Sequence, residues 1–333
     1  MPDDHDHPYD GLRDALARAA DAVTPGDGLA EVRRRTRSSS APRRRQAGVL
    51  LATGMAAAVI VGGGVALGQW HRSVPEAASP GAATAVYFLS STPTGTRLFR
   101  EFQQADAPSD PSGRVLGALR LLTSDHGPQD PDYRTAWPAG SFLDATAANG
   151  VVTVSLSDDA LRRPPGVASG DAYLGLQQAV YTAEAALGSS VPVAFVHDGT
   201  PATQVLGVPT GPRVPRDRGY DVTAPVNISD PVENQAVSGS LQARGSTGAD
   251  IGTPVSWTLS LPDGREVARG TARPLPSDPS VGTSLGAPGW ETGTIDVSGL
   301  APGRYVFRVE VTATGQTSAA SATYTDDRDI EIK

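Results

Sequence analysis

The chain has 333 residues, a formal net charge of −8 at pH 7, 5% aromatic residues and no cysteine. The acidic balance argues against nucleic acid as a partner, and the lack of cysteine excludes disulfide bonds. Any folded part must therefore be stabilised by apolar cores, which we expect to be built mostly from valine, leucine and alanine.

The first segment, residues 1–46, carries little apolar surface. Apolar residues recur at helical spacing from Leu12 to Val23, and Pro25-Gly26 ends the pattern. The spacing predicts one short amphipathic helix in a segment too small to form a core of its own. Two interpretations stay open: a helix that docks on a partner, or a frayed tail that helps to set membrane topology.

Residues 47–68 form an apolar run without any charged side chain. A helix over this run would be about 33 Å long, enough to cross the hydrocarbon core of a bilayer. Arg43, Arg44 and Arg45 directly precede the run, whereas only His71 and Arg72 follow closely. This asymmetry predicts a single-pass protein of the cell membrane, held in the lipid bilayer by residues 47–68, with residues 1–46 cytoplasmic and the C-terminal part extracytoplasmic.

Residues 69–83 are rich in proline, glycine and serine and predict a linker. Strand and helix patterns then alternate over residues 84–208, which predicts two helices packed on one mixed sheet. A hairpin is expected at Asn149-Gly150, and Asp171 is expected to cap the second helix. The predicted strands span residues 85–89, 97–102, 141–146, 151–156, 191–196 and 204–206, and the predicted helices span residues 113–122 and 172–187.

Several short sequence motifs in this segment match motifs of a known family and occur in the same order. They are Val86–Leu89, Leu116–Leu122, Trp137–Gly140, Val151–Ser157, Gln178–Thr182 and Val193–Gly199. With these motifs, residues 84–208 resemble the GerMN domain, named for sporulation and germination proteins. The resemblance implies an α/β module for binding and assembly. It transfers no active-site residue, because the family has no established catalytic constellation.

Residues 209–224 predict a second linker, and a two-residue periodicity follows over residues 225–333. Seven short strands with turn residues between them indicate an immunoglobulin-like β-sandwich. Trp257 is expected inside a central strand, and Tyr305 in a tyrosine corner. The predicted strands span residues 226–229, 236–245, 254–261, 265–271, 291–297, 304–311 and 321–332.

Several motifs of this last region also match a family. They are Ile228–Pro231, Val237–Gly239, Trp257, Leu261–Gly264, Trp290 and Pro302–Tyr305. With them, residues 225–333 resemble Gmad2, an immunoglobulin-like domain that often follows GerMN in bacterial envelope proteins. The predicted fold class of the chain is therefore α+β: a cytoplasmic helix, one transmembrane helix, a GerMN-like α/β domain and an all-β sandwich.

Few residues in the sequence suggest chemistry. Ser157, His197 and Asp198 are the residue types of a hydrolytic triad, but no nucleophile elbow surrounds a serine. Acidic residues on the last strand could bind calcium, although alternating acids on a strand are typical of a solvated face. These acidic residues are Asp326, Asp327, Asp329 and Glu331. We therefore expect no catalytic residue, no metal and no cofactor.

Recognition of a partner is expected in two loops. Residues 274–289 are too long for a simple turn and carry one charge, Asp278. Residues 124–137 form the matching candidate in the GerMN-like region. The alternative for the first loop is an insertion that ends in a core tryptophan. The candidate partner-binding residues are Pro274, Asp278, Leu285, Trp290 and Trp137.

The resemblances favour a non-catalytic binding and assembly protein of the cell envelope, of the GerMN sporulation and germination type. Its expected partners are envelope proteins or cell-wall polymer, and its oligomeric state is open. Two alternatives remain. The chain could relay binding across the membrane to its cytoplasmic helix, or it could be a hydrolase acting on the cell wall.

Overall fold

The computed structural model describes residues 83–105, 108, 110–217, 222–248, 254–275, 288–314 and 321–333. All described residues belong to one unit of the chain, Ile60–Lys333. The described part of this unit contains two hydrophobic cores. Buried residues between Val86 and Ala224 form the first core, and those between Val226 and Ile332 form the second.

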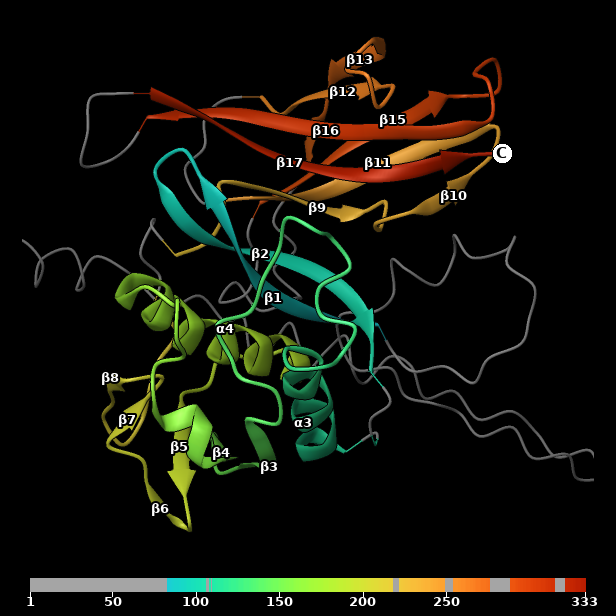
Figure 1. The fold of residues 1–333 in the computed structure, drawn as a ribbon. Helices are drawn as coiled ribbons and strands as arrows, with labels where there is room; N and C mark the ends of the chain where they lie inside the picture. The colour runs from blue at the N-terminus through green and yellow to red at the C-terminus, as the bar shows by residue number, and fades with distance from the viewer. Residues whose placement is uncertain are drawn as a thin grey trace, which may run out of the picture. The chain divides into compact units, whose positions relative to one another are not determined.

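The region around the first core holds two main sheets (Figure 1). Strands β1 (Ala83–Thr92) and β2 (Gly95–Gln104) form an antiparallel hairpin that is a sheet by itself. The second sheet has the order β3-β4-β5-β6, and only its β4–β5 pair is parallel. Its strands, with the short pair that follows them, are β3 (Phe142–Ala148), β4 (Val151–Leu156), β5 (Val193–His197), β6 (Thr200–Pro201), β7 (Gln204–Val205) and β8 (Val208–Pro209).

The prediction of one mixed sheet over residues 84–208 is wrong, because the β1–β2 hairpin pairs elsewhere. The backbone N–H of Leu98 in β2 donates to Val222 O at 2.8 Å, and Ala224 N–H donates back to Leu98 O at 2.9 Å. On the other strand, Leu89 exchanges two backbone hydrogen bonds with Arg134. Both outer edges of the hairpin are thus partly used, and neither is joined to β3–β6.

Two α-helices and one short 3-10 helix complete this region. Helix α3 spans Pro111–Leu121 and is capped by Asp110, whose carboxylate accepts a hydrogen bond from Gly113 N–H at 3.0 Å. Helix α4 spans Ser169–Leu187, and η1 spans Asp158–Leu161. The expected cap of α4 is wrong: the helix begins before Asp171, whose carboxylate lies 2.8 Å from Arg134 Nη2 instead.

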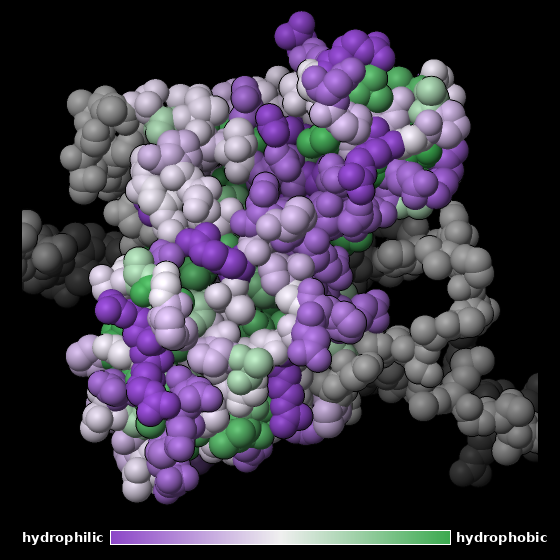
Figure 2. Space-filling model, viewed as in Figure 1, coloured by the Kyte–Doolittle hydropathy of each residue, from purple (hydrophilic) through white to green (hydrophobic). Residues whose placement is uncertain are grey.

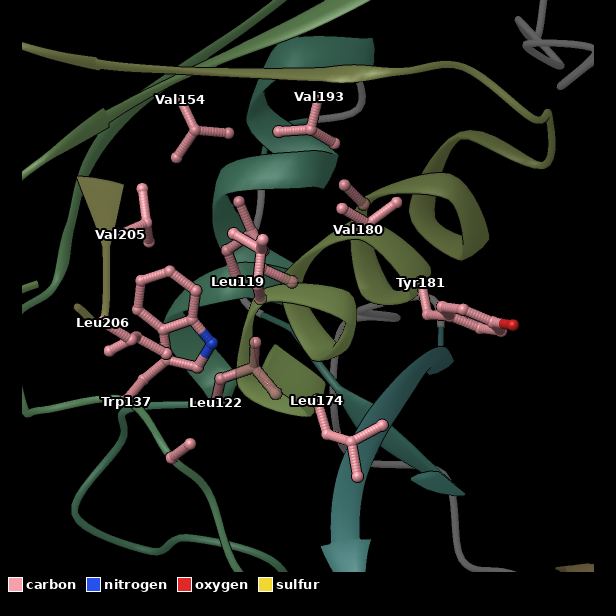
Figure 3. Close-up of a cluster of buried hydrophobic side chains, with 14 of the residues drawn as sticks. Leu119, Leu122, Trp137, Val154, Leu174, Val180, Tyr181, Val193, Val205 and Leu206 are labelled. Atoms are coloured by element: carbon pink, nitrogen blue, oxygen red, sulfur yellow. The ribbon is translucent and has the colours of Figure 1, made fainter. Parts of the chain in front are cut away.

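Trp137 lies buried within the first core. Figure 3 shows the indole of Trp137 beside Leu122 and Leu206, and the Tyr181 ring with its hydroxyl pointing away from the cluster. The indole N–H donates to the Gly175 carbonyl of α4 at 2.8 Å, so this polar group is satisfied within the core. Val214, Val222 and Ala224, from the segment predicted as a linker, also belong to this core.

The second core lies between the two sheets of a β-sandwich. The five-stranded sheet has the order β10-β17-β16-β12-β13, and the four-stranded sheet has the order β14-β15-β11-β9. These strands are β9 (Val226–Asp230), β10 (Gln235–Val237), β11 (Ser240–Thr247), β12 (Ser256–Ser260), β13 (Glu266–Thr271), β14 (Arg273–Leu275), β15 (Gly289–Asp296), β16 (Gly303–Thr314) and β17 (Ser321–Ile332). Strand β14 had not been predicted.

Two expected features of the sandwich are confirmed. Trp257 of β12 is buried and stacks on Phe307 of β16, with 6.2 Å between ring centroids. The Tyr305 hydroxyl donates to Ala301 O at 2.9 Å, which is the hydrogen bond of a tyrosine corner. Both features are ones that an immunoglobulin-like sandwich has.

The predicted α+β fold class is wrong for the described residues, which are mostly β and contain only two α-helices. No helix in the described ranges has the length and apolar character needed to span a bilayer. The run 47–68, the amphipathic helix before it and Arg43, Arg44 and Arg45 lie outside those ranges. The transmembrane helix of the predicted fold thus finds no support, and the location of the protein stays a prediction.

Candidate functional site

Charged side chains are buried where the two cores meet. We call this cluster the joint and define it as Asp130, Tyr133, Asn227, Asp326 and Arg328. Their side chains are almost fully excluded from solvent, with exposed fractions of 3% for Asp130, 5% for Asp326 and 2% for Arg328. Charged residues are rarely buried to this degree unless they are paired.

Strand β17 supplies the two central charges of the joint. Along this strand every second residue points inward, from Tyr324 through Asp326 and Arg328 to Ile330 and Ile332. The expectation that the acids of this strand share one solvated face is therefore wrong for Asp326. Its position in the two-residue repeat puts it on the inner side, in line with apolar residues.

The loop between α3 and β3 supplies the other half. Glu101 of β2 accepts hydrogen bonds from Gln129 N–H at 3.1 Å and from Asp130 N–H at 2.7 Å. Within the loop, Asp132 N–H donates to Asp130 Oδ1 at 2.8 Å, and Tyr133 N–H donates to Asp130 O at 3.1 Å. These hydrogen bonds hold the Asp130 carboxylate in position independently of its contact with Arg328.

Arg328 binds groups from both sides of the joint. Its Nη1 lies 2.5 Å from Asp130 Oδ2 and 3.0 Å from Asp326 Oδ1. Its Nη2 donates to the Tyr133 hydroxyl at 2.9 Å and to Ile228 O at 3.3 Å. The planar guanidinium therefore connects the α3–β3 loop with β9 and β17 at one point.

Asp326 is the second branching point of the joint. Its Oδ1 accepts a hydrogen bond from the Tyr133 hydroxyl at 2.7 Å. Its Oδ2 accepts from Ile228 N–H at 2.6 Å and from Asn227 Nδ2 at 3.3 Å. Asn227 Nδ2 also donates to Arg100 O of β2 at 3.1 Å, so the network extends to the hairpin.

The hairpin makes two further polar contacts with the sandwich. Arg100 Nη2 donates to Ser229 Oγ at 2.8 Å, and Thr94 Oγ1 lies 3.0 Å from the Tyr324 hydroxyl. Arg100 lies on β2 and Tyr324 on β17, while Thr94 lies in the turn before β2 and Ser229 on β9. Both contacts are therefore on or next to strands that build the joint. The hairpin and the α3–β3 loop together form the surface on which the sandwich rests.

Burial shifts the pKa values in the joint. Removal from water raises the pKa of Asp130 from 3.8 to about 7, although the nearby Arg328 acts in the opposite direction. Burial also raises the pKa of Asp326, again against the effect of Arg328. For Arg328, burial lowers the pKa, but the charges of Asp326 and Asp130 outweigh this effect and leave it above its usual value.

The residues predicted to bind a partner are dispersed. Trp137 and Trp290 are 4% and 1% exposed and lie inside the two cores, so they offer no surface for a contact. Pro274 is exposed in β14 and pairs with Trp290, whereas Asp278 and Leu285 lie outside the described residues. The loop 124–137, predicted as a recognition loop, instead contributes Asp130 and Tyr133 to the joint.

The residue types of a hydrolytic triad are not arranged as one. His197 Nε2 lies 2.6 Å from Asp158 Oδ1, and its Nδ1 lies 3.8 Å from Asp198 Oδ2. Among the described residues, the Ser157 hydroxyl has no hydrogen-bond partner. The imidazole thus contacts carboxylates at the end of β5 and on η1.

The other acids of β17 face basic side chains on the outer side of the sheet. Asp327 lies 2.8 Å from Arg308, and Asp329 lies 3.6 Å from Arg304. Figure 2 shows hydrophilic residues gathered over the area where Figure 1 draws β16 and β17. Across the described ranges, no three histidine, aspartate or glutamate residues are grouped so that they could hold a metal ion.

Comparison with known proteins addresses the first region. The family model described as "Germane: Sporulation and spore germination" matches residues 85–203. The chain carries a GerMN-type domain. This match runs from within β1 through β6 and includes Asp130 and Tyr133, but it does not extend to β17. The likeness of the sandwich to Gmad2 stays a prediction.

A solved structure is similar over part of its length. The tandem GerMN domains of the sporulation protein GerM from Bacillus subtilis match with 14% sequence identity and a TM-score of 0.32. The match covers 57% of this chain and 60% of that chain, so this chain spans less than two thirds of the GerM structure. No curated protein matches the chain.

Proposed function

We propose that the chain is a non-catalytic binding and assembly protein of sporulation or germination. In this proposal the GerMN-type domain and the β-sandwich act together, and a protein partner in the cell envelope contacts both of them. The GerMN-type domain supports the link to sporulation and germination. The joint supports the idea that the two regions work as one recognition body.

The observation that carries this proposal is the burial of Arg328 between two carboxylates. Removing three charges from water costs several kcal/mol per ion, and such a network is seldom more stable than an apolar contact of the same size. Its advantage is directional. The guanidinium must meet Asp130, Asp326 and the Tyr133 hydroxyl at once, which allows one arrangement of the GerMN-type domain against the sandwich.

A fixed arrangement matters most when a partner spans both regions. A partner that contacts a single domain gains nothing from the joint, since each domain has a core of its own. A partner that contacts both gains affinity because the two surfaces are already oriented and less freedom is lost on binding. The proposal therefore predicts that damage to the joint weakens partner binding although no joint residue is exposed.

Cross-linking in cells of the source organism tests this proposal. The gene is replaced by affinity-tagged versions of the wild type, Arg328→Met and Arg308→Met, and cross-linked proteins are identified during growth, sporulation and germination. Arg308 is the matched control because it also pairs with an aspartate of β17, yet its side chain is 52% exposed. We expect Arg308→Met to retain the partners of the wild type and Arg328→Met to lose at least tenfold in yield.

The possible outcomes separate the parts of the proposal. Equal partner yields from Arg328→Met, at equal protein levels, would show that the joint has no part in binding. A conservative second variant, Asp130→Asn, keeps the shape of the joint and is expected to retain the partners of the wild type. Absence of any cross-linked protein, together with normal sporulation and germination of a deletion strain, would refute the proposed function. Hydrolysis of cell-wall material by the purified chain would refute its non-catalytic character.

A further inference from the structure

We propose that the joint is a proton-controlled latch, which holds the GerMN-type domain and the β-sandwich together while one of its two carboxylates is protonated and loosens when both are ionised. The inference concerns the joint on which the proposed function rests. Its test measures the joint itself, so the latch and the function can fail independently.

The joint holds more acidic than basic groups. The buried cluster contains two carboxylates, Asp130 and Asp326, and one guanidinium, Arg328, within 3.0 Å of each carboxylate. With both carboxylates ionised, the cluster carries one uncompensated negative charge away from water. With one of them protonated, the cluster is neutral and its hydrogen bonds remain possible.

The groups that face Asp130 do not supply the missing positive charge. On β17 it faces Arg328 and Asp326, and from the turn after β9 it faces Glu233, whose charge raises its pKa further. On β2 its neighbour is Glu101, whose carboxylate accepts the Asp130 backbone N–H. Arg328 is thus the one cation among the groups that the structure places around this carboxylate.

Asp130 is the carboxylate that we expect to carry the proton. The pKa of this group is raised to about 7, chiefly by burial. Asp326 also has a raised pKa, but it accepts hydrogen bonds from Ile228 N–H, from the Tyr133 hydroxyl and from Arg328, and these favour its ionised form. Because the two groups are coupled, the transition near neutral pH belongs to the pair.

The direction of the switch follows from the sign of the shift. Between about pH 4 and pH 7 the closed joint binds more protons than the open one, in which Asp130 is solvated. A rise in pH through about 7 therefore opens the joint, and a fall closes it. Each domain keeps its own core, so opening separates folded regions without unfolding them.

Distance measurements on the full chain test the latch. The natural sequence has no cysteine, so two introduced cysteines take spin labels selectively. Gln204→Cys in the first region and Arg265→Cys in the sandwich are both at exposed positions. We expect the distribution of label distances to be narrow at pH 5.5 and clearly broader at pH 8.5, with the change centred near pH 7.

Two variants identify the group responsible. Asp130→Asn imitates the protonated acid, so its distribution is expected to stay narrow at both pH values. Asp132→Asn is the matched control, because it removes an exposed carboxylate of the same loop, and it is expected to behave like the wild type. An unchanged wild-type distribution, an Asp130→Asn variant that broadens like the wild type, or an Asp132→Asn variant that does not broaden would each overturn the proposal.

Discussion

Replacing Arg328 by methionine should lower the free energy of unfolding, because it removes the contacts that join the two regions. The guanidinium makes five hydrogen bonds, to Asp130, Asp326, the Asp327 and Ile228 carbonyls and the Tyr133 hydroxyl. Methionine replaces the aliphatic part of the arginine side chain but not the guanidinium, so it leaves two buried carboxylates without a cation. Removal of one partner from a buried ion pair typically costs about 3–5 kcal/mol.

The size of this effect should depend on pH. At pH 8 both carboxylates of the wild type carry charge for much of the time, so the joint is already loosened and the loss of Arg328 removes little further stability. At pH 5.5 the raised pKa of Asp130 keeps the wild-type joint neutral and closed, and Arg328→Met then leaves the buried Asp326 carboxylate without its cation. We therefore expect a loss of about 3–5 kcal/mol at pH 5.5 and a smaller loss at pH 8.

Urea unfolding followed by tryptophan fluorescence measures this difference, since Trp137 lies in the first core and Trp257 and Trp290 in the second. The control Arg308→Met breaks an exposed pair with Asp327 and should cost at most about 1 kcal/mol. At pH 5.5, a loss below about 1 kcal/mol for Arg328→Met, or a loss equal to that of the control, would refute the reasoning.

Three further predictions concern the pH dependence and the two cores. The stability contributed by Asp130 should be highest below about pH 4 and should fall as the pH rises through about 7, because its folded pKa lies above the unfolded 3.8; calorimetry should show this slope in the wild type and a flatter one in Asp130→Asn. Tyr305→Phe removes the hydrogen bond to Ala301 O and should cost about 1 kcal/mol in urea unfolding. Gly175→Ala should destabilise the first core by about 1–3 kcal/mol in thermal unfolding, since the new methyl would lie 2.6 Å from the methyl of Ala136. Gly170→Ala in the same helix meets no atom within 4 Å, so it should be neutral or stabilising.

The parts of the fold that sequence patterns predicted are those with a local cause. Asn149 and Gly150 both have a positive φ, as the two-residue hairpin turn between β3 and β4 requires. Trp257 and Tyr305 lie where an immunoglobulin-like sandwich places such residues. In each case the residue type and its immediate neighbours determine the geometry, so a single sequence contains enough information.

The errors have a common origin in contacts between distant residues. Asp171 looks like a helix cap from its neighbours, but its carboxylate is taken by Arg134, which is 37 positions earlier. The β1–β2 hairpin was assigned to the main sheet, but its edge pairs with residues 222–224. A periodic pattern shows that a segment forms a strand, and it does not show which strand or loop lies beside it.

The joint was missed for the same reason, and its charges made it harder to find. In sequence, the stretch from Tyr324 to Ile332 alternates in a way that places Asp326 and Arg328 with the apolar residues. That signal was present, but an aspartate and an arginine two positions apart on a strand also fit a solvated face. The partners that make burial possible, Asp130 and Tyr133, lie almost 200 positions away.

The chemistry of the joint also argues that it exists for more than stability. An apolar contact between the domains would resist separation at every pH and would tolerate sliding, because apolar attraction has no preferred direction. The contacts of Arg328 differ in both respects. Its donors permit one arrangement of the two domains, and the stability of that arrangement depends on the protonation of the two carboxylates that Arg328 binds. If stability alone had shaped this interface, an apolar triple substitution at Asp130, Asp326 and Arg328 should bind partners as well as the wild type does. The cross-linking experiment, extended to that variant, would distinguish a joint that orients from one that merely holds.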